Sequence, residues 1–264
     1  MPNPATSLRA AVAGSLDLPT AALRFASELF ADLDGLGSSP RRAANWLSRA
    51  GVGAQHRLLD LGCGNGAIAI AAARACGCRV VAIDAHGPFI DEARREAERV
   101  GVASRCEFHV GDVRRVGNVL RRTGAAGHLF DASMMISLLP AEDAVALLRR
   151  HTKPGGVMLI DDAVTLDRHA RGWRDDLPPT RAEMRDMLTR FGDAIIREHV
   201  LSRAESVRQN ESIQRRVERR ARAIARREPR AANHMSDVVS RQREAITLLT
   251  GPMRAGLWML RRSG

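Results

Sequence analysis

A glycine-rich turn between an expected strand and an expected helix is the most informative feature of the sequence. Residues 58–66 read Leu-Leu-Asp-Leu-Gly-Cys-Gly-Asn-Gly. Glycines after a strand let the backbone approach a ligand closely, and the first turn of the following helix offers free N–H groups. The turn therefore predicts a ligand site. With Ala67 it also fits the looser dinucleotide-binding pattern, whose last position can be alanine.

Three aspartates at the ends of expected strands distinguish between possible ligands. Asp60 lies two residues before the first glycine, where a carboxylate would meet an ammonium group rather than a pyrophosphate. Asp84 follows Gly62 by 22 residues and suits the two hydroxyls of a ribose. Asp112 could accept a hydrogen bond from an adenine amino group. A cationic amino acid joined to adenosine, without phosphate, is S-adenosylmethionine (SAM).

Short apolar runs alternate with helical patterns through the middle of the chain and would position these groups. Such alternation predicts a parallel sheet covered by helices on both faces, with the ligand at the carboxyl ends of the strands. We expect strands at 57–61, 79–84, 106–110, 129–136 and 156–161, and helices at 67–75, 88–100 and 141–151.

Five ordered motifs across residues 55–162 resemble those of the class I SAM-dependent methyltransferases. They are LLDLGCGNG, VVAID, HVGDV, FDASMMISLLP and KPGGVMLIDD. The resemblance implies an α/β fold with a Rossmann-like, doubly wound and mostly parallel seven-stranded sheet whose last strand is antiparallel. The run GLGS before a helix that begins at Pro40, together with a helical insert before the final strand, resembles the type 11/25 group that acts on small molecules.

The resemblance assigns the cofactor contacts to the three strand ends. We expect His86 to line the edge of the adenosine rather than to act as a base. The full set of expected cofactor residues is Asp60, Gly62, Cys63, Gly64, Gly66, Asp84, Ala85, His86, Asp112 and Val113.

The acceptor side of the site is expected to be apolar. Met134, Met135 and Leu138 follow or end the fourth strand, where many relatives carry a polar or aromatic residue. Asp161 and Asp162 follow the fifth strand, where ending the strand is the ordinary role, and Asp162 is the candidate substrate anchor or base. No metal is expected, because metal-dependent relatives need a further carboxylate at the end of the fourth strand.

The sequence suggests three consecutive segments. Residues 1–54 are expected to form a helical cover, with a helix at 20–33, and residues 55–165 the SAM-binding core. Residues 166–264 would complete the sheet. They include a loop with Trp173, a helix at 181–191 and strands at 194–201 and 256–262. The insert at about 203–250 is predicted to be a lid that helps to enclose the substrate, or a homodimer element.

The basic character of the protein is concentrated near its C-terminus. The chain has 264 residues, 41 basic and 30 acidic, with a net charge of +11. Residues 201–264 hold 15 arginines and 6 acidic residues. Lys153 is the only lysine, a bias typical of GC-rich genomes, which weakens the case for a nucleic-acid partner.

The run of arginines at 215–222 has an ordinary explanation and two functional ones. Ile213, Val217 and Ile224 recur at helical spacing, so one face should pack while the arginines face water. An anionic substrate or partner, or a nucleic acid, would also suit the run. The absence of tyrosine and a total of nine Phe and Trp argue against base stacking.

Other compositional features limit the possible locations. No apolar stretch is long enough to span a membrane, and the N-terminus lacks the pattern of a secretory signal. Four cysteines without metal-ligand spacing favour a reduced, cytoplasmic protein.

These observations predict a SAM-dependent methyltransferase that acts on a small molecule. An RNA methyltransferase that uses the arginine-rich helix is one alternative, and a non-catalytic SAM-binding regulator is another. No motif identifies the acceptor or its reacting atom (O, N, C or S), because a base is needed only where the acceptor must lose a proton.

Overall fold

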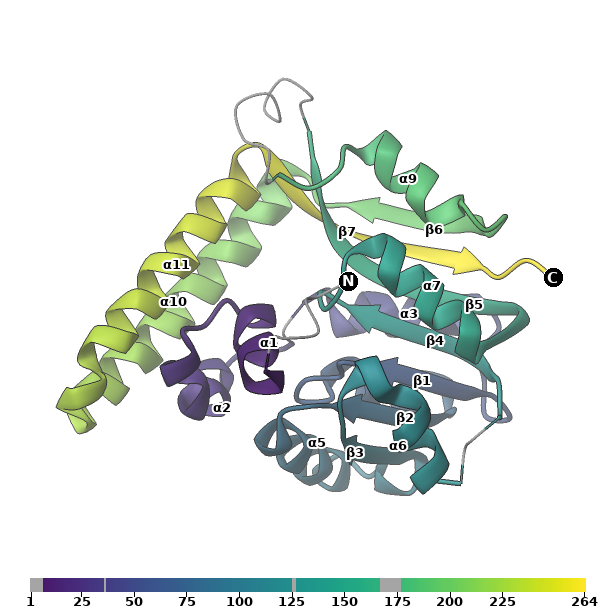
Figure 1. Cartoon of the computed structure of the whole chain (residues 1–264), viewed down its shortest axis with the longest axis horizontal. Coiled ribbons are helices and arrows are strands. Elements are labelled where there is room, and N and C mark those ends of the chain that lie inside the picture. Colours follow the sequence, from purple (N-terminus) through teal and green to yellow (C-terminus); the bar gives the residue numbers. More distant parts are fainter. Residues whose placement is uncertain (1–6, 36, 125–126, 167–176) are drawn as a thin grey trace. The chain divides into compact units, whose positions relative to one another are not determined.

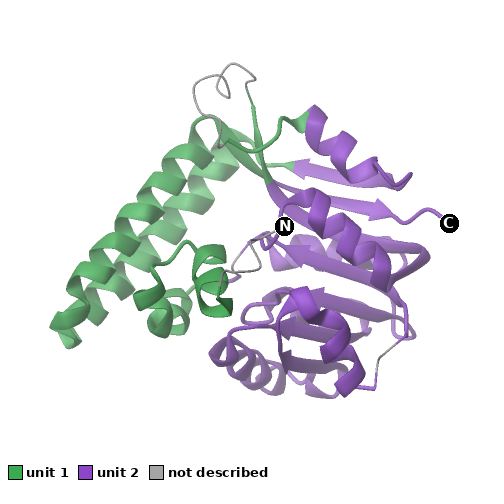
Figure 2. Cartoon of the chain, viewed as in Figure 1, with its two compact units in different colours: residues 1–33, 163–181, 200–255 green, residues 34–162, 182–199, 256–264 purple. Residues whose placement is uncertain are grey.

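The chain forms two compact units, each assembled from separated parts of the sequence (Figure 2). A computed structural model describes residues 7–35, 37–124, 127–166 and 177–264. Unit 1 comprises residues 1–33, 163–181 and 200–255, and unit 2 comprises residues 34–162, 182–199 and 256–264. The loop around Trp173 lies outside the described residues.

A seven-stranded sheet has the order β3-β2-β1-β4-β5-β7-β6 (Figure 1). Strand β1 pairs in parallel with β2 on one side and with β4 on the other, and β2–β3 and β4–β5 are also parallel. The chain order reverses between β1 and β4, and in such sheets ligands bind beyond the carboxyl ends of the strands at this point. The strands are β1 Arg57–Leu61, β2 Arg79–Asp84, β3 Cys106–Val110, β4 Phe130–Ile136, β5 Thr152–Thr165, β6 Ala194–Val200 and β7 Met253–Arg261.

Strand β7 runs antiparallel to β5. The N–H of Gly155 donates to the carbonyl of Arg262 over 3.0 Å, and the N–H of Leu166 donates to that of Pro252 over 2.9 Å. Residue numbers therefore fall along β7 as they rise along β5. This arrangement and the mostly parallel remainder confirm the fold predicted from the motifs. Strands β5 and β7 are longer than predicted, because their hydrogen-bonded pairing extends past the apolar runs that marked them.

Helices of unit 2 bury small and branched side chains against the sheet. The core cluster joins Leu47 of α3 and Ala69 of α4 to Leu58 of β1 and Met259 of β7. Helix α3 begins as predicted, since the Ser39 hydroxyl accepts the N–H of Arg42 and Pro40 occupies the first turn. The helices are α3 Pro40–Arg49, α4 Ala67–Cys76, α5 Gly87–Arg99, α6 Val116–Arg122, α7 Ala141–His151 and α9 Arg181–Thr189, with 3-10 turns η2 Ala103–Arg105 and η3 Val113–Arg115.

Two long antiparallel helices dominate unit 1 (Figure 1). Helix α10 begins with a capping box in which the Ser202 hydroxyl accepts the N–H of Glu205 and the Glu205 carboxylate accepts that of Ser202. Its apolar stripe packs against α11 and α2. The helices of this unit are α1 Leu8–Ser15, α2 Ala26–Phe30, α10 Arg203–Arg227 and α11 Ala232–Thr250, with 3-10 turns η1 Thr20–Phe25 and η4 Pro229–Ala231. The predicted insert thus forms one helical hairpin.

The N-terminal helix predicted at 20–33 is instead a 3-10 turn followed by the short helix α2. The break falls at Phe25, whose φ of −101° and ψ of 1° depart from α-helical values. Charged side chains join this segment to α10: the Asp32 carboxylate binds Arg219 over 2.7 Å and Arg220 over 2.6 Å, and Glu28 binds Arg227 over 2.7 Å. Part of the arginine run is therefore used within unit 1. Every helix among the described residues is too short or too polar to cross a bilayer.

The packing of α10 is testable with one pair of substitutions. Ile224 of α10 is fully buried, whereas Ile196 of β6 is 39% exposed. We expect Ile224→Ala to lower the free energy of unfolding by about 2–5 kcal/mol, because it removes a buried side chain and leaves a cavity. Ile196→Ala should cost about 1 kcal/mol or less. Urea unfolding followed by circular dichroism measures both, and equal losses would contradict this packing.

Candidate active site

The turn between β1 and α4 requires glycine at its first and last glycine positions. Gly62, Gly64 and Gly66 all have left-handed φ angles, of 77°, 54° and 76°. A Cβ at Gly62 would lie 2.5 Å from a methyl carbon of Leu138, and one at Gly66 would lie 2.7 Å from the Cβ of Ala93. Neither position has room for a side chain, and backbone without side chains can approach a ligand closely.

The Asp84 carboxylate ties this turn to the end of β2. Its Oδ2 accepts the N–H of Gly64 and its Oδ1 accepts the N–H of His86, each over 2.8 Å. Burial raises the pKa of Asp84, although these N–H groups favour its charged form. The N–H of Ala85 is a third donor, and the carboxylate keeps acceptor capacity for a ribose hydroxyl.

The Asp60 carboxylate lies close to Asp84 and is almost completely buried. It is 2% exposed. Burial, and then the charge of Asp84, raise its pKa to about 8. No described residue lowers the pKa of Asp60 by donating a hydrogen bond to it or by placing a positive charge beside it. A buried carboxylate without such a partner is costly to ionise, and an ammonium placed beside it would offset that cost. The residues therefore fit the amino-acid end of SAM.

Other predicted cofactor residues surround the same turn. The thiol of Cys63 is half-buried and lies 3.6 Å from the carbonyl oxygen of Gly64. Burial raises its pKa well above the usual range, so it is not a nucleophile. Ala85 donates its N–H to Asp84. The ring of His86 contacts that of Phe89 edge to face at 4.6 Å, and burial lowers its pKa.

The third predicted contact, Asp112, is held by a neighbouring arginine. Its carboxylate accepts the backbone N–H of Arg114 over 2.9 Å and binds the guanidinium over 2.7 Å. Burial alone would raise the pKa of Asp112, but these bonds bring it below the usual range. Val113 beside it is buried. Asp112 lies at the end of β3, next to the β2 strand that carries Asp84; its contact with adenine stays a prediction.

The predicted apolar acceptor wall is only partly accessible. Met134 is fully buried and belongs to the core cluster, because it shares one face of β4 with Ala132. Met135 is 1% exposed. Leu138 is partly exposed and packs directly against Gly62. Of the three predicted residues, Leu138 is the one whose side chain reaches the cofactor turn, and the structure places Met134 inside the fold.

A polar cluster at the ends of β4 and β5 was missed by the sequence analysis. The Ser137 hydroxyl donates to the Asp161 carboxylate over 2.8 Å, and Ser38 donates to the same carboxylate. Ser137 has a left-handed φ of 49°, a rare and strained conformation for a residue other than glycine that often marks a functional position. No short motif signals this cluster, because Ser38 lies about a hundred residues before its partners.

The two neighbouring aspartates of β5 have different surroundings. Asp161 is 5% exposed, and burial, together with the charge of Asp162, raises its pKa to about 6 despite the two serine hydrogen bonds. The Asp162 carboxylate accepts the N–H of Ala141 over 3.1 Å, at the start of α7. The ordinary role weighed for these aspartates, ending the strand, is wrong, because β5 continues to Thr165. The predicted part of Asp162 in substrate binding or proton transfer stays a prediction.

No group of three or more His, Cys, Asp or Glu side chains among the described residues could hold a metal ion. The four cysteines are free thiols.

Comparison with known proteins identifies the central domain. Residues 58–156 match the family model described as "Methyltransferase domain". The ribosomal protein L11 methyltransferase of Yersinia pseudotuberculosis is 32% identical over 111 residues. The match covers 40% of this chain, and the chain spans only 38% of the length of that relative.

Solved structures extend the similarity of the fold to nearly the whole chain. The SAM-dependent methyltransferase of Geobacter sulfurreducens, in complex with S-adenosylhomocysteine, has a TM-score of 0.70 at 18% identity and covers 94% of this chain and 99% of its own. The cyclopropane synthase MmaA2 of Mycobacterium tuberculosis has a TM-score of 0.73 at 14% identity and covers 98% and 100%.

The segment matched by the family model is a methyltransferase domain, and the fold around β1–β5 is that of solved SAM-dependent methyltransferases. The family match ends at residue 156. Ser137 lies within the matched segment, whereas Ser38, Asp161 and the helical hairpin lie outside it.

The buried Asp60 carboxyl makes a prediction about proton release. Its raised pKa keeps it largely protonated at neutral pH, and a bound ammonium would favour the ionised form. Binding of S-adenosylhomocysteine should therefore release a proton from Asp60. The affinity for this ligand should rise between about pH 6 and 8, by up to about tenfold per pH unit.

Calorimetry in two buffers of different ionisation enthalpy measures this release. In Asp60→Asn the residue cannot titrate, so its contribution should disappear, while titration of the ligand's own amine remains in both proteins. Equal proton release by the variant and the unmodified protein would show that Asp60 does not meet the ammonium.

Proposed function

We propose that the protein methylates a small molecule by in-line displacement. The methyltransferase part of the proposal rests on the arrangement of Asp60, the glycine turn and Asp84. Asp60 fits the ammonium of SAM, Asp84 fits its ribose, and the glycine turn lets the backbone lie close to the cofactor. When bound, SAM supplies an electrophilic methyl group on a sulfonium. The chain must then place an acceptor atom about 3 Å from that methyl group and in line with the sulfur.

Each residue of the cofactor site has a separate task in this proposal. Asp60 binds the ammonium, Asp84 binds the ribose hydroxyls and fixes the turn, and the glycine backbone lies against the ligand. Leu138 excludes water next to the turn, which suits a transition state in which the positive charge on sulfur disappears.

Acceptor chemistry is assigned to the Asp161 cluster. With a pKa of about 6, the Asp161 carboxyl is poised to accept a proton near neutral pH. The Ser137 hydroxyl donates to Asp161, and its oxygen has lone pairs for an acceptor O–H or N–H. Ser137 lies beside Leu138, which contacts the cofactor turn. We therefore favour an acceptor that must lose a proton, bound through Ser137.

The proposal of a small acceptor depends on how much of the chain resembles the curated methyltransferase relatives. The relative named ribosomal protein L11 methyltransferase matches only 111 residues, and this stretch is about as long as the cofactor domain. Its name would favour a protein acceptor. The polar groups found at the acceptor side here are one compact cluster, in which the exposed Ser137 hydroxyl leads to the buried Asp161 carboxyl. A single compact site of this kind suits a small polar molecule better than a flexible polypeptide. The free thiols favour a reducing, cytoplasmic setting.

Substitutions at the two aspartates separate their roles. Asp161→Asn should lower kcat by about a hundredfold, because an amide cannot take a proton, and should leave the affinity for S-adenosylhomocysteine within about threefold, because Asp161 is not a proposed cofactor ligand. Asp162→Asn keeps an oxygen for the N–H of Ala141 and should retain activity. Steady-state kinetics and calorimetry check both, and a large loss in Asp162→Asn alone would restore Asp162 as the base.

Identification of the acceptor tests the function itself. Incubation with methyl-labelled SAM and fractionated cell extract should place the label in small molecules. An Asp84→Ala variant, in which binding is weakened by about 1–3 kcal/mol, should show much less incorporation at a limiting SAM concentration. Label in RNA or in a ribosomal protein would refute the small-molecule acceptor, and SAM binding without incorporation into any fraction would favour a regulator.

A further inference from the structure

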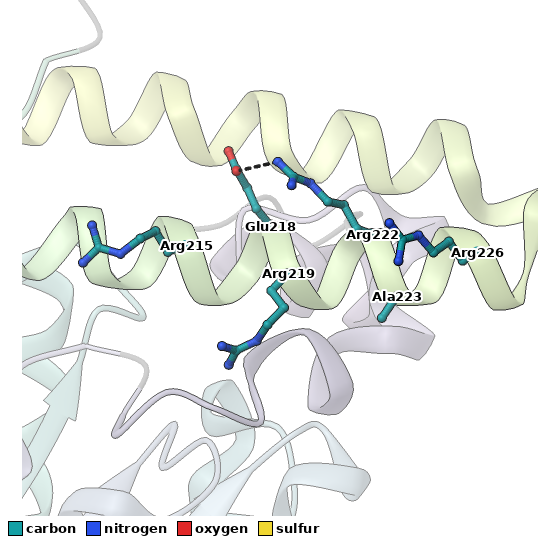
Figure 3. A pocket seen from close by; sticks show the side chains of 6 residues that line it. All are labelled: Arg215, Glu218, Arg219, Arg222, Ala223 and Arg226. Atoms are coloured by element: carbon teal, nitrogen blue, oxygen red, sulfur yellow. Dashed lines mark hydrogen bonds and ion pairs between the residues drawn. The ribbon is translucent and has the colours of Figure 1, made fainter.

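Four arginines form one stripe along α10, in unit 1. Arg215, Arg219, Arg222 and Arg226 are spaced by four, three and four residues, which places them on one side of a helix. Three of their side chains are 71%, 67% and 70% exposed, at Arg215, Arg219 and Arg222 respectively. Together with Glu218 and Ala223 they line a pocket of about 440 Å³ (Figure 3).

Carboxylates near the pocket are fewer than its guanidinium groups and are shared. Glu218 already binds Arg243 of α11 over 2.7 Å, and Arg222 over 3.3 Å. These arginines and Gln214 lower the pKa of Glu218, so it stays charged. Arg215 is 3.8 Å from Glu211. For Arg226, no carboxylate partner is recorded within the described part of the chain.

Glu218 therefore forms ion pairs with Arg222 and Arg243 and does not neutralise the other arginines of the stripe. Helix α10 as a whole has nine arginines and three glutamates. The pocket keeps a clear excess of positive charge.

The arrangement is unfavourable for an isolated helix. Like charges four residues apart destabilise a helix, and the stripe holds two such pairs. The use of arginine rather than lysine carries no information here, since the chain has a single lysine. The argument depends on the positions of the charges, which an anion bound between them would stabilise.

The chemistry of the pocket walls defines the class of ligand. Guanidinium groups bind phosphate oxygens in pairs, and arginines four residues apart are separated by about 6 Å along a helix axis. Ala223 leaves space between them, and no aromatic side chain of the described residues lines the pocket. Recognition would thus depend on several phosphates and not on a stacked base.

We propose that this pocket binds a compact polyanion, a small ligand with two or more phosphate groups. All six lining residues belong to unit 1, whereas the cofactor turn belongs to unit 2. The proposal is therefore independent of the methyltransferase function and can fail without affecting it.

Calorimetry with inorganic tripolyphosphate as the probe tests the site. The pocket variant is Arg215→Ala/Arg222→Ala/Arg226→Ala, which leaves Arg219 to its ion pair with Asp32. The control is Arg41→Ala/Arg74→Ala/Arg95→Ala, three exposed arginines of unit 2 that remove the same charge. Circular dichroism confirms that each variant is folded.

We expect one tripolyphosphate per chain, with affinity reduced about tenfold or more in the pocket variant and less than about threefold in the control. Equal weakening in both variants would mean attraction by net charge alone, and would overturn the proposal. So would the absence of binding at low salt. Tighter binding of homopolymeric RNA than of tripolyphosphate through the same three arginines would overturn it in favour of a nucleic-acid surface.

Discussion

The double hydrogen bond from the Gly64 and His86 N–H groups to the Asp84 carboxylate is the interaction on which the rest of the site depends. It joins the turn after β1 to the end of β2. The Asp84 side chain thereby fixes the ends of two strands, β1 and β2, that are predicted to hold the cofactor. The left-handed glycines can adopt this turn without strain, but the carboxylate selects it. The N-terminus of α4, which is the positive end of the helix dipole, is thereby held in a fixed position after the turn.

Two buried carboxylates, Asp60 and Asp161, and the partly buried Asp84 make this edge of the sheet costly for the protein alone. Burial raises the pKa of Asp60, Asp84 and Asp161, which means that folding disfavours their charged forms. A cationic ligand next to Asp60 stabilises the charge there. At Asp161 the raised pKa gives a group that can exchange a proton near neutral pH. In the proposed function, the same physical cost serves binding at Asp60 and proton transfer at Asp161.

The positions of most strands and helices could be predicted because they depend on local patterns. The strand at 57–61, the helix from Pro40 and the hairpin at 203–250 all follow from apolar periodicity and from capping residues, and the structure confirms them. Periodicity failed at residues 20–33, where the apolar spacing is helical but the backbone leaves the helix at Phe25. The glycines and aspartates of the cofactor turn were predictable because their spacing along the chain is itself the constraint.

The sequence by itself determined the fold class and predicted the cofactor and the strand ends that would bind it, because each of these follows from residues close together in the chain. Only the tertiary structure showed that Met134 lies in the core, that Ser38 meets Asp161, and that Asp32 binds the arginines of α10. These contacts join segments that are far apart in sequence, so no local pattern encodes them. The proposed acceptor side depends on such contacts, so Ser38 and Ser137 were found only in the folded chain.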